Sequence, residues 1–303
     1  MMYQAHPPQF SDSVKAFFGR KTVLSRLILI NLLVFLLGYI VHLGMWLFKL
    51  ETADGIRLFT EWIAVPSSLA RLLQKPWTPF TYMFLHENFF HLLFNMVTLY
   101  FGSTIFLKYF NDRQLLLTYL IGGLLGAAFY ILAFNFFPVF LEANPFALAL
   151  GASASALAVV IAAAVFAPQY TVDLMFIGQV RMKYIALFFI LMDIFSIQGN
   201  NPGGHIAHLG GAVWGAIYAL SLRKGFNHFR GLQRVKGSRI RKRRKQESTA
   251  KSYGGRPVND DEYNRQRNER QQEVDRILDK ISKHGYDSLS EQEKAILFSH
   301  SRK

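Results

Sequence analysis

A pair of serines, Ser153 and Ser155, stands among glycine and alanine in the apolar run over residues 148–157. A serine hydroxyl becomes a nucleophile when a neighbouring base accepts its proton. The competing interpretation is a helix crossing point, where small residues let another helix approach and each hydroxyl bonds back to its own helix. Chemistry is therefore indicated only if other segments bring a base and hydrogen-bond donors to the same place.

Histidine and asparagine side chains in two other apolar segments could supply those groups. His91 and Asn95 are spaced i and i+4, so they share one face of a helix. His86 comes five residues before His91, a spacing that does not fit the same face, and we place it in a bend ahead of the helix. His205 and His208 lie in a later segment, and each could act as a base.

Glycine spacing favours one of these two histidines. His208, Gly211 and Gly215 fall at i, i+3 and i+7, which puts them on one stripe of a helix. Such a stripe fits a partner helix rich in small residues, and the serine-containing run is one. This packing would bring Ser153 within hydrogen-bonding distance of His208. His205 lacks the stripe, so we interpret it as a polar group at the mouth of the site.

The composition indicates a membrane protein with a basic tail. Just over half of the 303 residues are hydrophobic, yet the formal charge is +14. Up to Leu222 the sequence consists mainly of apolar runs, several of the roughly 18 to 25 residues that a bilayer crossing requires. From Arg223 onward there are 22 Lys and Arg against 11 Asp and Glu, so +11 of the +14 lies in the tail. The absence of Cys excludes disulfides and thiolate metal sites.

The apolar runs predict an all-α polytopic membrane protein with six transmembrane helices. The spans are expected over residues 24–48, 82–107, 114–137, 146–166, 184–197 and 203–222. The domain organisation is a cytoplasmic N-terminal segment over 1–23, a six-span domain over 24–222, a basic linker over 223–257 and a small cytoplasmic C-terminal helical hairpin over 258–303. The mixed segment over 51–75 is expected to lie on the membrane rather than through it.

Charge placement predicts the orientation in the membrane. Lys108 and Arg113 lie between the second and third spans, and Arg181 and Lys183 between the fourth and fifth. The alternate loops, one of them around Glu142, carry no cations. By the positive-inside rule both termini are cytoplasmic in a multi-pass protein of a bacterial-type inner or plasma membrane.

This topology places the polar groups at one depth. The second, fourth and sixth spans all enter from the outside, so His91, Ser153 and His208 are expected near the outer face. Ser153 would lie about 10 Å below the start of its span, at the rise of an α-helix. Polar groups inside a membrane are costly to keep, so their convergence indicates function.

The tail is expected to contact lipid. Its basic run over residues 239–245 is typical of a positive-inside anchor on anionic lipid head groups, and no nucleic-acid partner is expected because the tail directly follows a span. Farther along, the pattern over 288–293 predicts a capped start to a last short helix.

Three separated motifs carry a resemblance to a known family. They are His86-Glu87-Asn88-Phe89-Phe90-His91-Leu92-Leu93-Phe94-Asn95 preceded by Trp77, Gly151-Ala152-Ser153-Ala154, and Ala207-His208-Leu209-Gly210-Gly211 followed by Gly215. Together, and in this order, they resemble the rhomboid intramembrane serine proteases over roughly residues 62–222. The resemblance implies a six-span rhomboid-like bundle that cleaves transmembrane protein substrates within or just outside the outer leaflet, with no cofactor and no metal.

The resemblance also implies roles for individual residues. Ser153 would be the nucleophile and His208 the general base, a dyad without the carboxylate of the three-member arrangement. His91, Asn95 and the Ser153 backbone N–H would bind the oxyanion. The supporting residues would be His86, Gly151, Gly211 and Gly215.

The chain departs from the family pattern at three positions. Ala154 stands where the family usually has glycine, so its methyl group is expected to affect the backbone that presents the Ser153 N–H. Leu157 stands where some members place a tyrosine against the catalytic imidazole, so His208 is expected to be held less firmly. Thr78 replaces an arginine often found after the loop tryptophan. Asp193, which belongs to no motif, is expected to cap or hydrogen-bond locally.

Two other functions remain open at this point. An inactive rhomboid-like protein could bind membrane helices without cutting them, which Ala154 favours and the intact Ser153 and His208 oppose. A metal transporter or metal site is the other alternative, but no carboxylate is expected to join its histidines and the serine would go unexplained. Its ligands would be His86, His91, His205 and His208.

Overall fold

The computed structural model describes residues 10–49, 55–175 and 177–226, together with the short stretches 276–277, 280–281 and 288–294. The chain divides into two compact units, residues 1–235 and 236–303. Most of the expected basic linker and much of the expected C-terminal hairpin lie outside the described residues. The predicted capped helix start is confirmed, because Ser290 N donates to Glu293 Oε2 at 2.7 Å and Glu293 N donates to Ser290 Oγ at 3.3 Å. A further bond from Lys280 lowers the pKa of Glu293 to about 2.

Six helices of the first unit correspond to the six predicted spans. They are α2 (Val23–Leu47), α6 (Phe89–Phe106), α7 (Asp112–Phe136), α8 (Ser153–Phe166), α9 (Met182–Ser196) and α10 (Pro202–Arg223). Among the described residues, α2, α6 and α7 are long and apolar enough to cross a membrane by length and composition. Helices α8 and α9 are shorter, with 14 and 15 residues.

The remaining elements are short. They are α1 (Phe10–Gly19), α3 (Gly55–Ile63), β1 (Val65–Pro66), α4 (Leu69–Gln74), α5 (Thr78–Thr81), η1 (Tyr82–Phe84), η2 (Pro138–Phe140), β2 (Leu148–Ala149), β3 (Thr171–Leu174) and β4 (Gly178–Arg181). The strands form two small antiparallel sheets, β1 with β2 and β3 with β4, that the all-helical prediction did not include. The fold is otherwise helical, as expected.

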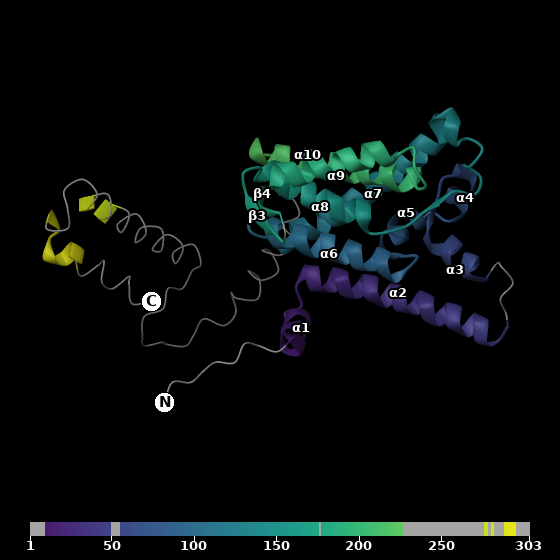
Figure 1. The fold of residues 1–303 in the computed structure, drawn as a ribbon, viewed down its shortest axis with the longest axis horizontal. Helices are drawn as coiled ribbons and strands as arrows, with labels where there is room; N and C mark the ends of the chain where they lie inside the picture. The colour runs from purple at the N-terminus through teal and green to yellow at the C-terminus, as the bar shows by residue number, and fades with distance from the viewer. Residues whose placement is uncertain are drawn as a thin grey trace, which may run out of the picture. The chain divides into compact units, whose positions relative to one another are not determined.

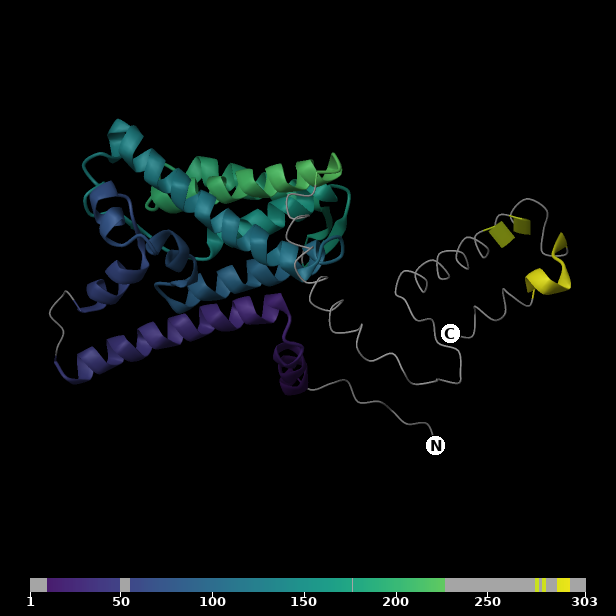
Figure 2. The ribbon, with the colours of Figure 1, turned by 180° about the vertical axis from the view of Figure 1, so that it is seen from behind.

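The first unit has two distinct ends (Figures 1 and 2). The β3–β4 hairpin and α1 lie at one end, and α3, α4 and α5 lie at the other. Because consecutive long helices run in alternate directions, the first turns of α6, α8 and α10 all lie at the α3–α5 end. The segments that carry the predicted chemistry therefore begin at the same end of the bundle.

Helix α8 is the centre of the packing and contacts α6, α7, α9 and α10. Its residues from Ala154 to Ala164 are buried. Glycines on the neighbouring helices allow the closest contacts: a Cβ built at Gly211 would lie 2.1 Å from the Ala154 carbonyl oxygen, and one at Gly215 would lie 2.3 Å from the Ala158 oxygen. Helices α8 and α10 thus meet backbone to backbone, which is the contact that the glycine stripe predicts.

Two of the expected helix boundaries are wrong. Helix α6 begins at Phe89 rather than near residue 82, because residues 82–84 form the 3-10 turn η1 and the Asn88 side chain accepts a bond from His91 N at 2.9 Å, capping the helix there. Helix α8 begins at Ser153 rather than near residue 146, because β2 is extended and pairs with β1. Ser153 is therefore the first residue of its helix and not a residue two turns inside it.

Candidate active site

Ser153 takes its position from the backbone turn that precedes α8. Gly151 has φ of +122°, a conformation that side chains other than hydrogen rarely allow. A Cβ at Gly151 would lie 2.9 Å from His91 Nε2 and 3.6 Å from Ser153 Oγ. The glycine therefore lets the imidazole and the hydroxyl approach the same turn. Gly151 N donates to Tyr82 O at 3.0 Å, which ties this turn to η1.

Ser153 opens into a cavity of about 250 Å³ at the α3–α5 end of the bundle. Its walls come from the start of α6, the turn before α8 and the start of α10. The lining includes Glu87, His91, Gly151, Ser153, Asn201 and Ala207. The first backbone N–H groups of a helix have no partner within it and carry a partial positive charge. The N-terminus of α8 can therefore stabilise negative charge that develops in this cavity.

The histidines before and within α6 form an edge-to-face pair. The rings of His86 and His91 have centroids 5.2 Å apart and planes at 72°. His86 lies between η1 and α6, so the predicted bend is confirmed. Both ring nitrogens of His86 and Nδ2 of Asn95 are buried and have no hydrogen-bond partner within the described part of the chain. Asn95 thus holds a buried donor without a partner in the described part of the chain, but it does not line the cavity of Ser153.

The structure places His208 near the cavity through the α8–α10 contact. Ala207, its chain neighbour, lines the cavity, and Gly211, one turn later, lies against Ala154. Among the described residues, no hydrogen bond joins Ser153 Oγ to His208. Catalytic hydrogen bonds are often long in structures without substrate.

Ser155 points away from the cavity. It is fully buried, and its Oγ lies 3.9 Å from Met83 Sδ. A Cβ at Gly123 of α7 would lie 2.5 Å from this oxygen. The two serines of the run therefore have different surroundings, and Ser153 alone faces the cavity.

Asp193 of α9 is a site residue that the sequence analysis misassigned. Its Oδ1 lies 2.7 Å from His208 Nδ1 and 2.9 Å from His205 Nδ1. The expectation that Asp193 bonds locally is wrong, as is the expectation that no carboxylate joins the histidines. A signal was present in the sequence: Asp193 lies six residues before Gly199 and His205 six residues after it. In antiparallel helices joined by a short turn, residues equidistant from the turn lie level.

The methyl group of Ala154, which stands where the family usually has glycine, fits between α8 and α7. A Cβ at Gly126 of α7 would lie 2.6 Å from the Ala154 Cβ. The methyl group therefore occupies space that Gly126 leaves open. Leu157, the second departure, is buried in the core and brings no polar atom to the imidazole.

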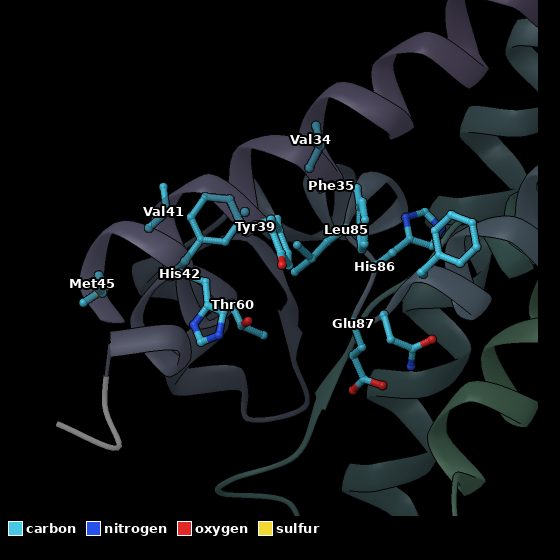
Figure 3. Close-up of a pocket in the computed structure, with 14 residues that line it drawn as sticks. Val34, Phe35, Tyr39, Val41, His42, Met45, Thr60, Leu85, His86 and Glu87 are labelled. Carbon is cyan, nitrogen blue, oxygen red and sulfur yellow. The ribbon is translucent and has the colours of Figure 1, made fainter. Parts of the chain in front are cut away.

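A larger cavity of about 710 Å³ lies beside the site (Figure 3). Figure 3 shows side chains of α2, among them Phe35, Tyr39 and His42, on one side, with His86 and Glu87 of the segment before α6 also lining it. Its walls are mostly apolar, and Ser153 is not among them. Glu87 lines both cavities, so they adjoin at the start of α6.

Comparison with known proteins places the chain in a family. A family model described as "Rhomboid domain" matches residues 73–225, which is just over half of the chain. The chain belongs to the rhomboid family. A second model, described as "Family of unknown function (DUF6576)", matches residues 259–303.

A curated relative agrees with this assignment. The protein is similar to "RHOMBOID-like protein 12, mitochondrial" of Arabidopsis thaliana, with 32% identity over 157 residues. The match covers 49% of this rhomboid and 47% of the relative, so the chain spans about half the length of that protein. The shared region corresponds in length to the rhomboid domain and not to the whole of either chain.

Proposed function

We propose that this rhomboid is an intramembrane serine endopeptidase that cleaves transmembrane proteins near the outer leaflet. Ser153 attacks the scissile carbonyl, and His208 accepts its proton and later gives it to the leaving amine. The observation that carries the proposal is the position of Ser153 at the first residue of α8, facing the cavity that His91 also lines. The close contact of Gly211 with Ala154 supports His208 as the base.

The oxyanion of the tetrahedral intermediate would be bound by three donors. These are the Ser153 backbone N–H, the His91 side chain and the Asn95 side chain. The unpaired Nδ2 of Asn95 and the position of His91 beside Gly151 support this role, because donors for a transient charge must be available before that charge forms.

The decisive experiment compares single variants in a cleavage assay. We expect Ser153→Ala and His208→Ala each to abolish cleavage of a transmembrane substrate, and the double variant to be no worse, because the pair acts as a unit. Ser153→Ala should also lose labelling by a serine-reactive fluorophosphonate. Ser155→Ala is the matched control and should cut and label normally, since Ser155 faces Met83 and Gly123. Full activity of Ser153→Ala would refute the proposal.

The alternatives give different results in the same experiment. An inactive membrane-helix-binding rhomboid would bind substrate without cleavage and without labelling. A metal transporter would retain zinc on purification and would not cleave the substrate. Replacing its histidines would remove the zinc. The intact serine, in a cavity that His91 also lines, favours the protease over both.

In the membrane, we propose six spans with both termini cytoplasmic. Lys108 follows α6 and Arg113 lies in the first turn of α7, while Arg181 ends β4 and Lys183 lies in the first turn of α9. These element ends lie at the β3–β4 end of the bundle, which supports that end as the cytoplasmic one. Ser153 would then face the outer leaflet. Reporter fusions at Glu142 should give an external signal, and an internal signal there would overturn the topology. The proposed membrane is a bacterial-type inner or plasma membrane.

Beyond its substrates, the proposed partners are anionic lipid head groups at the basic tail. The excess of +11 in the chain after residue 222 supports this, because each cation near an anionic leaflet contributes about 1 kcal/mol. No nucleic-acid partner is proposed.

A further inference from the structure

We propose that Asp193 is a positioning residue that orients His208 for catalysis, so that the site works as a Ser153–His208–Asp193 triad. The proposal rests on the proposed protease function. It concerns a third helix, α9, which lies outside the three motifs.

The hydrogen bonds of the carboxylate fix the imidazole. An ionised carboxylate only accepts hydrogen bonds, so His208 must carry a proton on Nδ1 to make its 2.7 Å contact with Asp193 Oδ1. In the neutral ring this leaves the Nε2 lone pair free, and a base needs that lone pair to accept the serine proton. The bond therefore selects both the tautomer and the rotation of the ring.

His205 makes the second contact with the same oxygen and holds the carboxylate in place. Its Nδ1 lies 2.9 Å from Asp193 Oδ1. Asp193 is only 5% exposed, so it is held by protein donors in a place where an unpaired charge would be costly. The two histidines lie three residues apart on α10 and both face α9.

The spacing fits hydrogen bonds better than a metal site. The three ligand atoms lie within 4.8 Å of one another. Ligand arms of about 2.0–2.1 Å in a tetrahedral zinc site would separate neighbouring ligand atoms by about 3.3 Å. The separations of 2.7 and 2.9 Å are shorter than that and are typical of an N–H donor facing a carboxylate oxygen.

The proposed step is a proton transfer with a stationary carboxylate. As Ser153 Oγ bonds to the substrate carbon, its proton passes to His208 Nε2, and the ring becomes an imidazolium. The Nδ1 proton stays on the ring, and Asp193 remains ionised and stabilises the new positive charge. The scissile C–N bond then breaks as the Nε2 proton passes to its nitrogen, and the ring returns to its neutral form. The acyl group stays on Ser153 Oγ until water hydrolyses it.

No polar side chain of α8 can do the same work one turn beyond Ser153. Leu157 occupies that position and is aliphatic. The sequence therefore predicts a loosely held imidazole, whereas the contact from α9 holds it through its other nitrogen. Asp193 thus supplies an orienting contact that the three motifs do not contain.

The first test separates kcat from KM. Asp193→Asn keeps the size of the side chain but can donate to Nδ1, which favours the wrong tautomer. We expect kcat to fall by between about 10-fold and about 10⁴-fold with KM little changed. Asp193→Glu, which restores a carboxylate, should recover part of the loss. Asp173→Asn in β3 is the matched control for the chemical change and should leave kcat unchanged.

The second test does not depend on activity. Nitrogen NMR of the full chain with ¹⁵N-labelled histidine, recorded at pH 8 and assigned with His208→Ala, reports which ring nitrogen carries the proton. We expect the Nδ1–H form for His208 in the wild type and a shift towards Nε2–H in Asp193→Asn.

The outcomes distinguish this inference from the proposed function. If the wild type does not cleave, the protease proposal fails, and the NMR signal still decides whether Asp193 sets the tautomer. Wild-type kcat in Asp193→Asn, or an unchanged His208 tautomer in that variant, would overturn the inference.

Discussion

Helices α8 and α2 are both apolar, yet they differ in how much of their surface is buried in the protein. Helix α8 consists mainly of alanine, serine and valine and is buried from Ala154 to Ala164. Helix α2 is rich in leucine, and its buried residues are confined to its first turns, from Leu24 to Asn31. Apolar character alone therefore indicates a membrane protein, whereas side-chain size indicates which helix faces the protein and which faces lipid.

The difference has a consequence for the chemistry. In α8 the backbone itself touches α10, so an atom added at this contact has to displace the helix that Ser153 begins. In α2 a change on the exposed face has no protein atom to displace. The same substitution should therefore have a large effect at the contacts of α8 and little effect on the exposed face of α2.

The largest contrast is expected from a glycine-to-leucine exchange in α10 and in α2. A Cβ at Gly211 would lie 2.1 Å from the Ala154 oxygen, so Gly211→Leu must push α8 and α10 apart. A displacement of about 1 Å can cost on the order of 100-fold in rate, so we expect this variant to be inserted but inactive in the cleavage assay.

Gly44→Leu in α2 is the matched control. A Cβ there meets nothing within 4 Å, so cleavage should stay at the wild-type level. If both variants cleave normally, or if both are inactive, the proposed difference between the helices is wrong.

A smaller effect is expected where two small residues share one space. A Cβ at Gly122 of α7 would lie 2.4 Å from the Ala158 Cβ of α8, with its other neighbours at 3.7 Å. Gly122→Ala should lower stability by about 1–3 kcal/mol through overpacking. Adding Ala158→Gly removes the opposing methyl group and should recover part of that loss, as measured by unfolding in detergent. If the stability lost in the double variant equals the sum of the losses in the two single variants, the contact between the two methyl groups does not cause the effect of Gly122→Ala.

Much of the fold could be predicted from the sequence because its signals are local. Each of the six apolar runs corresponds to a helix, and the glycine stripe of α10 meets α8 as its spacing implies. The bend at His86 and the capped start at Ser290 also follow from neighbouring residues.

The errors arose where distant segments meet. The start of α8 depends on the pairing of β2 with β1, more than 80 residues earlier in the chain, and hydropathy carries no record of it. The contact of Asp193 with His208 depends on how α9 packs against α10. The room for the Ala154 methyl group depends on Gly126 of α7. Each of these is a tertiary contact that a single apolar run does not encode.

The smallest effects are expected within α2 itself, where one face packs on protein and the other does not. Leu27 is 2% exposed and Leu37 is 53% exposed. Leu27→Ala should lower stability by less than the roughly 2–5 kcal/mol typical of water-soluble cores, because lipid tails are as apolar as leucine and mainly the cavity term remains. Leu37→Ala should change stability by no more than about 0.5 kcal/mol. Its exposed side chain contacts apolar lipid or detergent tails in the folded and in the unfolded protein alike. Unfolding of both variants in the same detergent measures the difference. A larger loss from Leu37→Ala would mean that the exposed face of α2 is covered by protein and not by lipid.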